Sequence, residues 1–459
     1  MFIRVLTIVI LFFGHFTISF AGPDKDEAYA WFRAYLQVDT INPPGNEINA
    51  VKFLSEIFDQ EGIEWHSAES APGRGNIWAR IKGGNEPALM LLHHSDVVPA
   101  DPKYWSVDPL SADEKDGFVY GRGALDTKGL GISHLATFIA LNRAGKPLNR
   151  DVVFLASADE EAGGLYGVGW LTEHHPEIFE GVGMILNEGG STTNLGEKLV
   201  LDIEVTQKVP VWLRIKAVDK PGHGSSPHAT SSVTRIAKAM NAILDKPFPA
   251  RIIPVVDTMF KGTSRNIGAE WEEDFANMSD AIKRPGFLRK LQDNFAGFHA
   301  LTRDTCSLTR MGGSNKINVV PPEAWAEIDC RMLPDRTVAE FIKDFKSRLE
   351  GLGVEVEIIM AFSPAISPTD NILFKAIETV MRGKYPGIET VPNVSTGFTD
   401  SHFTRDLGIA SYGYSTDIIE PSETDSVHGN DERTNINAFK QGVIDLFDIV
   451  GHLVYQKMS

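Results

Sequence analysis

The spacing of hydrophobic residues in the first half of the chain indicates alternating helices and strands. Asp24–Val38 and Glu47–Glu61 carry apolar residues every three or four positions, as amphipathic helices do. Gly129–Gly145 has the same character and contains no proline. Three compact apolar runs indicate buried strands at Ala88–Leu92, Val152–Ala156 and Val182–Leu186. This alternation predicts an α/β fold with helices on both faces of one sheet.

The pattern changes beyond about residue 201, where exposed strands and helices are mixed. Val211–Val218 alternates between apolar and polar residues, like a strand with one exposed face. The acidic stretch Ala269–Asp280 is expected to be irregular. The other expected elements are two strands and two helices, over Ala324–Arg331, Val354–Met360, Ser231–Leu244 and Val338–Leu349. These features predict an α+β unit that differs from the first part of the chain.

The first pattern returns after Pro364. Helices are expected over Asn371–Tyr385 and Asn435–Gln456. The sequence therefore predicts one α/β domain, formed by residues 22–203 and 362–459, which is interrupted by a smaller inserted domain over residues 204–361.

The first 21 residues have the character of a secretory signal peptide. Arg4 precedes an apolar run, and Ser19 and Ala21 are the small residues expected before a cleavage site. An uncleaved membrane anchor is the alternative, but the run is short beside the ~20 apolar residues that a spanning helix needs. We therefore expect cleavage after Ala21 and export to the periplasm or the extracellular space.

Composition narrows the possible partners and redox chemistry. The chain has 61 Asp and Glu against 44 Lys and Arg, a net charge of −17, and no dense basic stripe, which argues against a nucleic-acid partner. Its only cysteines, Cys306 and Cys330, are too few for a disulfide framework. Two buried free thiols are the favoured interpretation, and a disulfide is the alternative open to an exported protein.

Polar residues follow each of the three predicted buried strands. His94 and Asp96 follow the first, the adjacent Glu160 and Glu161 the second, and Glu188 the third. In an α/β sheet, ligands bind beyond the carboxyl ends of the strands, so these side chains are expected to converge. Asp126, in a glycine-rich loop, and His428, before the last helix, complete a set of nitrogen and oxygen donors that suits zinc.

Several motifs in this order resemble one known family. Leu92–Pro99, Gly121–Asp126, Asp159–Glu161 and the later blocks resemble the dinuclear zinc exopeptidases and deacylases, which include carboxypeptidase S, aminoacylase, glutamate carboxypeptidase and the succinyl-diaminopimelate desuccinylases. The resemblance is strongest to the carboxypeptidase S-like branch and extends from about Asp24 to Gln456. It implies a mixed-sheet zinc exopeptidase catalytic domain with an inserted α+β lid and dimerisation domain.

The resemblance also implies a role for each motif residue. Asp126 would bridge two zinc ions, with His94 and Glu188 on one ion and Glu161 and His428 on the other. Glu160 would be the general base and then the general acid, and Asp96 would orient His94 or position a neighbouring group. Thr127 and Glu188 depart from the residues most common in relatives.

Further roles fall in and around the inserted domain. The resemblance implies that His223, in a small-residue turn, reaches the active site of a neighbouring subunit, so a homodimer is expected. Asn318 and Arg331 would hold the carboxylate of the substrate, because the planar guanidinium pairs two donors with a carboxylate. Gly413 would contact the substrate through its backbone.

The expected activity is zinc-dependent hydrolysis of an amide bond, either the bond that holds a C-terminal residue or the bond within an N-acyl amino acid. Two alternatives stay open. One is a dipeptidase that acts on short peptides, and the other is a non-catalytic homologue that binds amino-acid conjugates.

Overall fold

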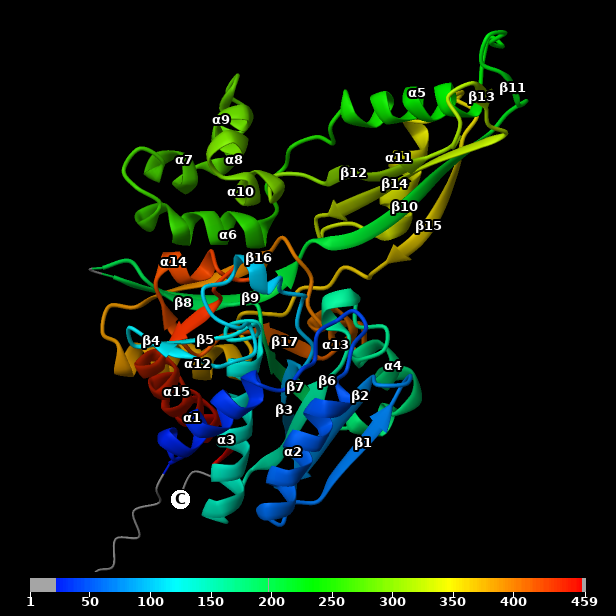
Figure 1. Ribbon diagram of the computed structural model, residues 1–459. Coiled ribbons are helices and arrows are strands. Elements are labelled where there is room, and N and C mark those ends of the chain that lie inside the picture. Colours follow the sequence, from blue (N-terminus) through cyan, green and yellow to red (C-terminus); the bar gives the residue numbers. More distant parts are fainter. Residues whose placement is uncertain (1–21, 197, 456–459) are drawn as a thin grey trace, which may run out of the picture.

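A computed structural model describes residues 22–196 and 198–455, so the predicted signal peptide lies outside the described residues. A ten-stranded sheet forms the centre of the larger part of the molecule (Figure 1). Strands β3, β6, β7 and β17 at its middle are parallel, and β2 and β9 flank them in the antiparallel sense. The sheet runs in the order β1 (Trp65–Glu69), β2 (Gly75–Ile81), β6 (Arg150–Ser157), β3 (Glu86–His94), β7 (Val182–Asn187), β17 (Ala410–Gly413), β9 (Leu199–Gln207), β8 (Ser191–Asn194) and β18 (Ile418–Ile419), with β16 (Glu389–Ser395) paired to β9.

Helices cover both faces of this sheet, as the sequence predicts. The main core packs one face against α1 (Lys25–Leu36), α2 (Ile48–Gln60), α3 (Lys128–Ala144), α12 (Ile372–Lys384) and α15 (Ile436–Val454). On the other face, α4 (Val168–His174) and α13 (Ser401–Asp406) contribute to a smaller core with β3, β6 and β7. No helix in the described part of the chain combines the length and the hydropathy that a bilayer span requires.

A second sheet forms a separate layer, which we call the lid. Its four antiparallel strands are β12 (Thr305–Gly312), β14 (Glu323–Met332), β10 (Val209–Val218) and β15 (Glu355–Ala361), in that order. Helices α5 (Ser232–Leu244) and α11 (Val338–Ser347) share its core. At its far end β11 (Gly222–His223) pairs with β13 (Val319–Val320), and we call this hairpin-like end the lid tip (Figure 1).

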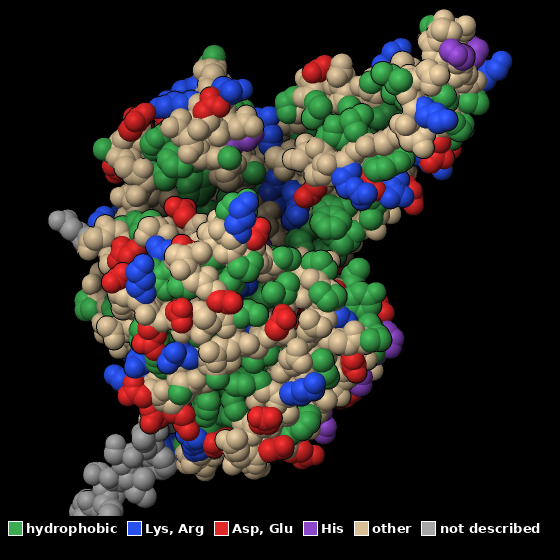
Figure 2. Space-filling view, viewed as in Figure 1, with side chains coloured by type: hydrophobic (Ala, Val, Ile, Leu, Met, Phe, Trp, Pro, Cys, Tyr) green, Lys and Arg blue, Asp and Glu red, His purple; other side chains and the backbone are tan. Residues whose placement is uncertain are grey.

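The segment predicted as one inserted domain divides into two parts. The helices α6 (Pro254–Thr263), α7 (Glu272–Ala276), α8 (Met278–Ala281), α9 (Phe287–Asn294) and α10 (Ala296–Ala300) lie over β16, not in the lid. Their core includes Val391 and Val394 of β16. Residues Ala269–Asp280, expected to be irregular, contain α7 and part of α8, because Phe275 and Met278 are buried in this core. Figure 2 shows a recess between these helices and the lid, with Lys and Arg side chains along it.

The structure corrects the prediction of free thiols. Cys306 of β12 and Cys330 of β14 form a disulfide. The two residues lie directly opposite each other in the antiparallel register, so their side chains lie next to each other. The bond joins the strand that follows the helical segment to the strand that carries Arg331.

Candidate metal centre

Side chains from five separate segments converge at the carboxyl ends of the central parallel strands. His94 ends β3, Glu160 and Glu161 lie in a short 3₁₀ turn after β6, and Glu188 follows β7. Asp126 lies just before α3. His428 follows α14 (Pro421–Thr424) and precedes β19 (Arg433–Asn435), which pairs with β5 (Phe118–Tyr120) and through it with β4 (Glu114–Lys115).

Asp126 lies between the two histidines. Its Oδ1 is 3.0 Å from Nε2 of His94, and its Oδ2 is 3.0 Å from Nε2 of His428. On one side Glu188 Oε2 is 3.6 Å from His94 Nε2. On the other side Glu161 Oε2 is 3.2 Å from His428 Nε2. The cluster therefore consists of two adjoining donor sets that share one carboxylate.

The donor atoms are close enough to hold metal ions. Those of His94, Asp126 and Glu161 lie within 4.8 Å of one another, and so do those of His94, Glu160 and Glu188. The Oε1 atom of Glu161 is buried and has no hydrogen-bond partner. A buried carboxylate oxygen without a partner is costly unless a cation is bound beside it. This donor set therefore fits divalent cations that prefer nitrogen and oxygen ligands, such as zinc.

The pKa values of the cluster also indicate that its carboxylates lack positive charge beside them. Burial, and then the charge of Glu188, raise the pKa of Glu160 well above its usual value. Burial raises the pKa of Glu188 to about 7. Burial alone would lower the pKa of His94, but the carboxylates of Glu188 and Asp126 outweigh it and hold that pKa well above its usual value. Hydrogen bonds with Asp126 and Glu161 raise the pKa of His428 to about 10.

Asp96 supports the cluster from behind. His94 Nδ1 donates to the backbone carbonyl of Asp96 at 3.0 Å, which leaves Nε2 directed at the donor cluster. The carboxylate of Asp96 accepts the backbone N–H groups of Glu160 and Glu161, both at 3.2 Å. Asn42 donates to the same carboxylate at 2.8 Å. Asp96 therefore positions both its histidine neighbour and the pair of glutamates, and it lies outside the two donor sets.

Glu432 is a supporting residue that the sequence reasoning did not single out. Its fully buried carboxylate accepts the backbone N–H groups of three residues in the glycine-rich loop, and one of these is Asp126. Arg122 donates to the same carboxylate at 2.6 Å. The peptide bond between Asp126 and Thr127 is cis, and the Thr127 hydroxyl donates to the carbonyl of His94. The only sequence signal for Glu432 was its place four residues after His428.

A second buried network holds the turn that carries the paired glutamates. Arg74 contacts Asp159 at 2.6 Å and Glu47 at 2.7 Å, and all three side chains are buried. Asp159 has a positive φ of 68° directly before Glu160. No sequence pattern pointed to this network, because its members are far apart along the chain.

Arg331 lies on β14 with part of its guanidinium already paired. Its Nε and Nη2 atoms donate to Asp329 at 2.8 and 3.2 Å, and its guanidinium lies over the ring of Phe398. Its Nη1 atom is buried and has no partner. One edge of the guanidinium is therefore occupied, and Nη1 is left for another acceptor.

Gly413 ends β17 beside the metal cluster. A Cβ at this position would lie 2.2 Å from the carbonyl oxygen of Glu188. Glycine is thus required for the close approach of β17 to the segment that carries Glu188.

The structure does not bring His223 and Asn318 to the metal cluster of the same chain. Both lie exposed at the lid tip, where Gly224 donates its N–H to the carbonyl of Asn318 at 2.9 Å (Figure 1). The Nδ1 atom of His223 contacts the hydroxyl of Ser225 at 2.8 Å. The two residues are therefore neighbours of each other, at the end of the lid farthest from the large sheet.

Two His and three carboxylates at the strand ends of an α/β sheet, with a lid formed by an inserted segment, define the class of metal-dependent hydrolases. Residues 90–450 match the model of peptidase family M20/M25/M40, and the chain belongs to this family. The family includes a dinuclear metal-binding peptidase. The resemblance seen in the motifs is confirmed, and the protein is a metallopeptidase or amidohydrolase.

Two curated proteins and one solved structure illustrate what the chain is similar to. The N-fatty-acyl-amino acid synthase/hydrolase PM20D1 of Xenopus tropicalis is 28% identical, over 79% of this chain and 72% of that protein. Human aminoacylase-1 is 26% identical, over 92% of this chain and 94% of that protein. The M20 family metallo-carboxypeptidase Sso-CP2 from Sulfolobus solfataricus superposes with a TM-score of 0.72 at 19% identity, over 93% of this chain and 98% of that one. This last likeness confirms the fold.

Proposed function

We propose that the protein is a zinc-dependent hydrolase with two zinc ions per chain, which cleaves the amide bond of an N-acyl amino acid or of a C-terminal residue. The observation that carries the proposal is the position of Asp126 between His94 and His428, with Glu160 beside the shared site. Relatives that hydrolyse acyl amino acids support the substrate class. Aminoacylase-1 aligns along nearly its whole length.

Asp126 would be shared by the two ions, with His94 and Glu188 on one and Glu161 and His428 on the other. When bound, the ions supply Lewis acidity for the attacking water and the scissile carbonyl. Glu160 takes a proton from the attacking water and then delivers it to the leaving nitrogen. Glu160 is assigned this work because its carboxylate lies 4.0 Å from Nε2 of His94, whereas Glu161 lies closer to its histidine, at 3.2 Å from Nε2 of His428.

Arg331 is the proposed anchor for a free carboxylate on the substrate. Asp329 holds the guanidinium in place, and the buried Nη1 is left to donate to the ligand. A charge-assisted hydrogen bond in such a desolvated position is strong. The substrate would therefore need a carboxylate close to the scissile amide.

The lid tip supports a homodimer in which His223 and Asn318 complete the partner's site. The two residues lie away from their own metal cluster, and Ile317 and Val319 beside them are exposed large hydrophobic side chains. Exposed apolar side chains that lie side by side are typical of an interaction surface. In the dimer, His223 would donate to the oxyanion that forms from the scissile carbonyl.

Export is proposed from residues 1–21, and the disulfide is consistent with it. Bonds such as Cys306–Cys330 persist in oxidising compartments and are rare in the cytosol.

A substrate panel tests the proposed function. N-acyl amino acids, their amidated counterparts and free dipeptides would be compared with zinc added, and the metal content would be measured. We expect about two zinc ions per chain and turnover only of substrates with a free carboxylate. Faster turnover of dipeptides than of every acyl amino acid would favour a dipeptidase, and binding without turnover would favour a non-catalytic homologue.

A further inference from the structure

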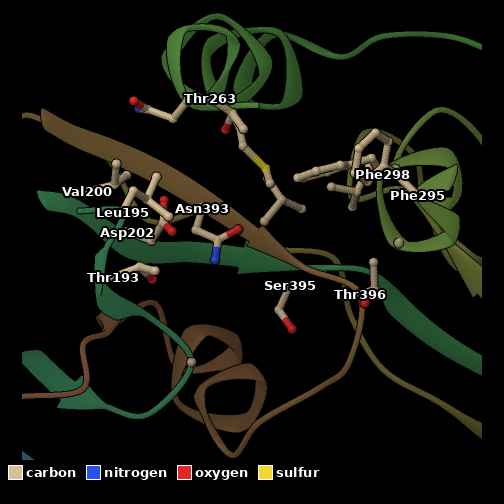
Figure 3. A pocket seen from close by; sticks show the side chains of 16 residues that line it. Thr193, Leu195, Val200, Asp202, Thr263, Phe295, Phe298, Asn393, Ser395 and Thr396 are labelled. Carbon is tan, nitrogen blue, oxygen red and sulfur yellow. The ribbon is translucent and has the colours of Figure 1, made fainter. Parts of the chain in front are cut away.

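A cavity of about 550 Å³ lies between the helical segment and the edge of the large sheet, outside the metal cluster (Figure 3). Its size is within the range of small-molecule sites, roughly 300–1,000 Å³. Gly189 lines it and directly follows Glu188, a residue of the metal cluster. Ser395 and Thr396 also line it, two to three residues before Phe398, whose ring lies under Arg331. The segments that line the cavity therefore continue directly into the metal cluster and toward the ring that lies against the proposed carboxylate anchor.

The two walls of the cavity differ in chemistry. The wall formed by the helical segment is mainly apolar, with Met259 of α6, Phe298 of α10 and Phe295 between α9 and α10, and its polar residues are Thr263 and Asn266. The wall formed by the sheet carries the polar side chains of Thr193 of β8, Asp202 of β9 and Asn393 of β16 (Figure 3). Apolar side chains lie among them, namely Leu195, Val200 and Val394. A ligand that fills this space meets hydrocarbon on both walls and finds the charged group on the sheet side.

Asp202 is the charged group of the cavity. It is the only ionisable side chain among the described residues that line the space. Neighbouring carboxylates are paired: Glu204, two residues along the same strand, binds Arg405 at 2.6 Å. Among the described residues no cation is placed against Asp202 in this way, and burial raises its pKa to about 6. A half-buried carboxylate that lacks a cation carries a desolvation cost, which a ligand cation would offset.

We propose that this cavity binds the part of the substrate next to the scissile amide, and that it selects an apolar stem that ends in an ammonium group paired with Asp202. The stem would lie against Met259, Phe295 and Phe298. A purely hydrocarbon group is disfavoured, because it would displace water from the Asp202 carboxylate and offer no polar group in its place. This inference rests on the proposed function. The stem can belong to the side chain of the residue that bears the carboxylate or to the acyl group, and the experiment separates these two sources.

The test uses two pairs of substrates that differ only in the terminal ammonium group. For the side chain the pair is Nα-acetyl-lysine and N-acetyl-norleucine, and for the acyl group it is ε-aminocaproyl-alanine and caproyl-alanine. In the wild type we expect kcat/KM to favour the ammonium member of one pair. In Asp202→Asn, which keeps the shape and removes the charge, we expect this preference to fall by about tenfold to a hundredfold, the value of a hydrogen bond to a charged group.

The matched control is Asp257→Asn. Asp257 lies on α6, pairs with Lys261 on the surface and does not line the cavity. This variant should keep the wild-type preference. Zinc content and thermal unfolding of both variants would show that the fold is intact.

Calorimetry separates failure of this inference from failure of the proposed function, because it needs no turnover. Lysine and norleucine, and ε-aminocaproate and caproate, would be titrated into the zinc-loaded wild type and Asp202→Asn. Tighter binding of the ammonium member that depends on Asp202 supports the cavity assignment even if no substrate is hydrolysed. The inference is overturned if neither pair is discriminated, or if discrimination persists unchanged in Asp202→Asn.

Discussion

The metal cluster and the lid tip contrast in what holds their functional side chains. In the cluster, His94 is buried at the end of a central strand, and its orientation is set by Asp96. At the tip, His223 is exposed and its ring contacts the hydroxyl of Ser225, two residues away. The cluster is thus positioned by the fold of its own chain, whereas the tip holds its histidine in a short turn. His223 therefore needs a second surface before it can face a substrate.

The first prediction concerns the cluster and carries the largest effect. Glu160→Gln should lower kcat by on the order of a thousandfold or more, because the proton shuttle is lost. Zinc content should stay near the wild-type value, since Gln keeps the shape of a residue that is not a proposed ligand. Steady-state kinetics and metal analysis on the same preparation would check this.

Glu161→Gln is the matched control for that variant. It replaces a proposed ligand, so it should lower zinc content as well as activity. If Glu160→Gln loses metal as readily as Glu161→Gln, the roles assigned to the adjacent glutamates are wrong.

The second prediction tests the tip. His223→Ala should lower kcat by about a hundredfold to a thousandfold, as the loss of an oxyanion donor does. Mixing it with Glu160→Gln and allowing subunits to exchange should restore up to about a quarter of wild-type activity, because about half of the dimers are mixed and each has one complete site.

The readout for this mixture is activity against time, with subunit exchange followed by a labelled chain. Confirmed exchange without any return of activity would show that His223 acts within its own chain or not at all. A monomer at assay concentrations would have the same meaning. The two variants assayed separately provide the baseline.

The third prediction concerns Arg331, which lies between the two regions. Arg331→Ala should lower kcat/KM for substrates with a free carboxylate by about 2–3 kcal/mol, or roughly thirtyfold to a hundredfold or more, since one charged donor is lost. Zinc binding should not change. Amidated substrates should lose little, and an equal loss on both substrate classes would indicate a structural role on β14.

The contrast between regions also explains what the sequence could predict. The proposed ligands follow apolar runs at strand ends, and this local pattern was enough to expect that His94, Glu160 and Glu188 would converge. The lid strands were predicted from alternation. Asp202 and Glu432 could not be predicted in the same way. The proposed role of each depends on contacts with segments that are distant along the chain. The acidic residues of Ala269–Asp280 obscured the apolar positions that its helices bury. The cysteine pairing depended on the register of β12 and β14, which the sequence does not reveal.

The fourth prediction tests how strongly the cluster depends on Glu432. Glu432→Gln should weaken zinc binding by roughly tenfold to a hundredfold, as changes to groups that orient metal ligands do. The reason is that three backbone N–H groups and Arg122 would lose a charged acceptor. Competition with a zinc chelator would measure the change. Glu423→Gln, at another buried carboxylate nearby in the chain that has no contact with the Asp126 loop, is the control and should leave zinc affinity unchanged.

The last prediction is the smallest and concerns stability at the cavity. The folded pKa of Asp202 is about 6, against a usual value of 3.8, so the folded protein binds this proton more tightly than the unfolded chain. Above about pH 6 the ionised carboxylate therefore destabilises the fold, and the penalty disappears as the pH falls below about 4. Asp202→Asn should raise the free energy of unfolding by about 1–3 kcal/mol at pH 7–8 and by much less near pH 4. Urea unfolding of both proteins across this range isolates the effect, because the titration of the metal cluster is common to both. A gain that does not depend on pH would mean that the ionisation of Asp202 is not its cause, and a loss of stability at pH 7–8 would mean that the charge of Asp202 already has a partner.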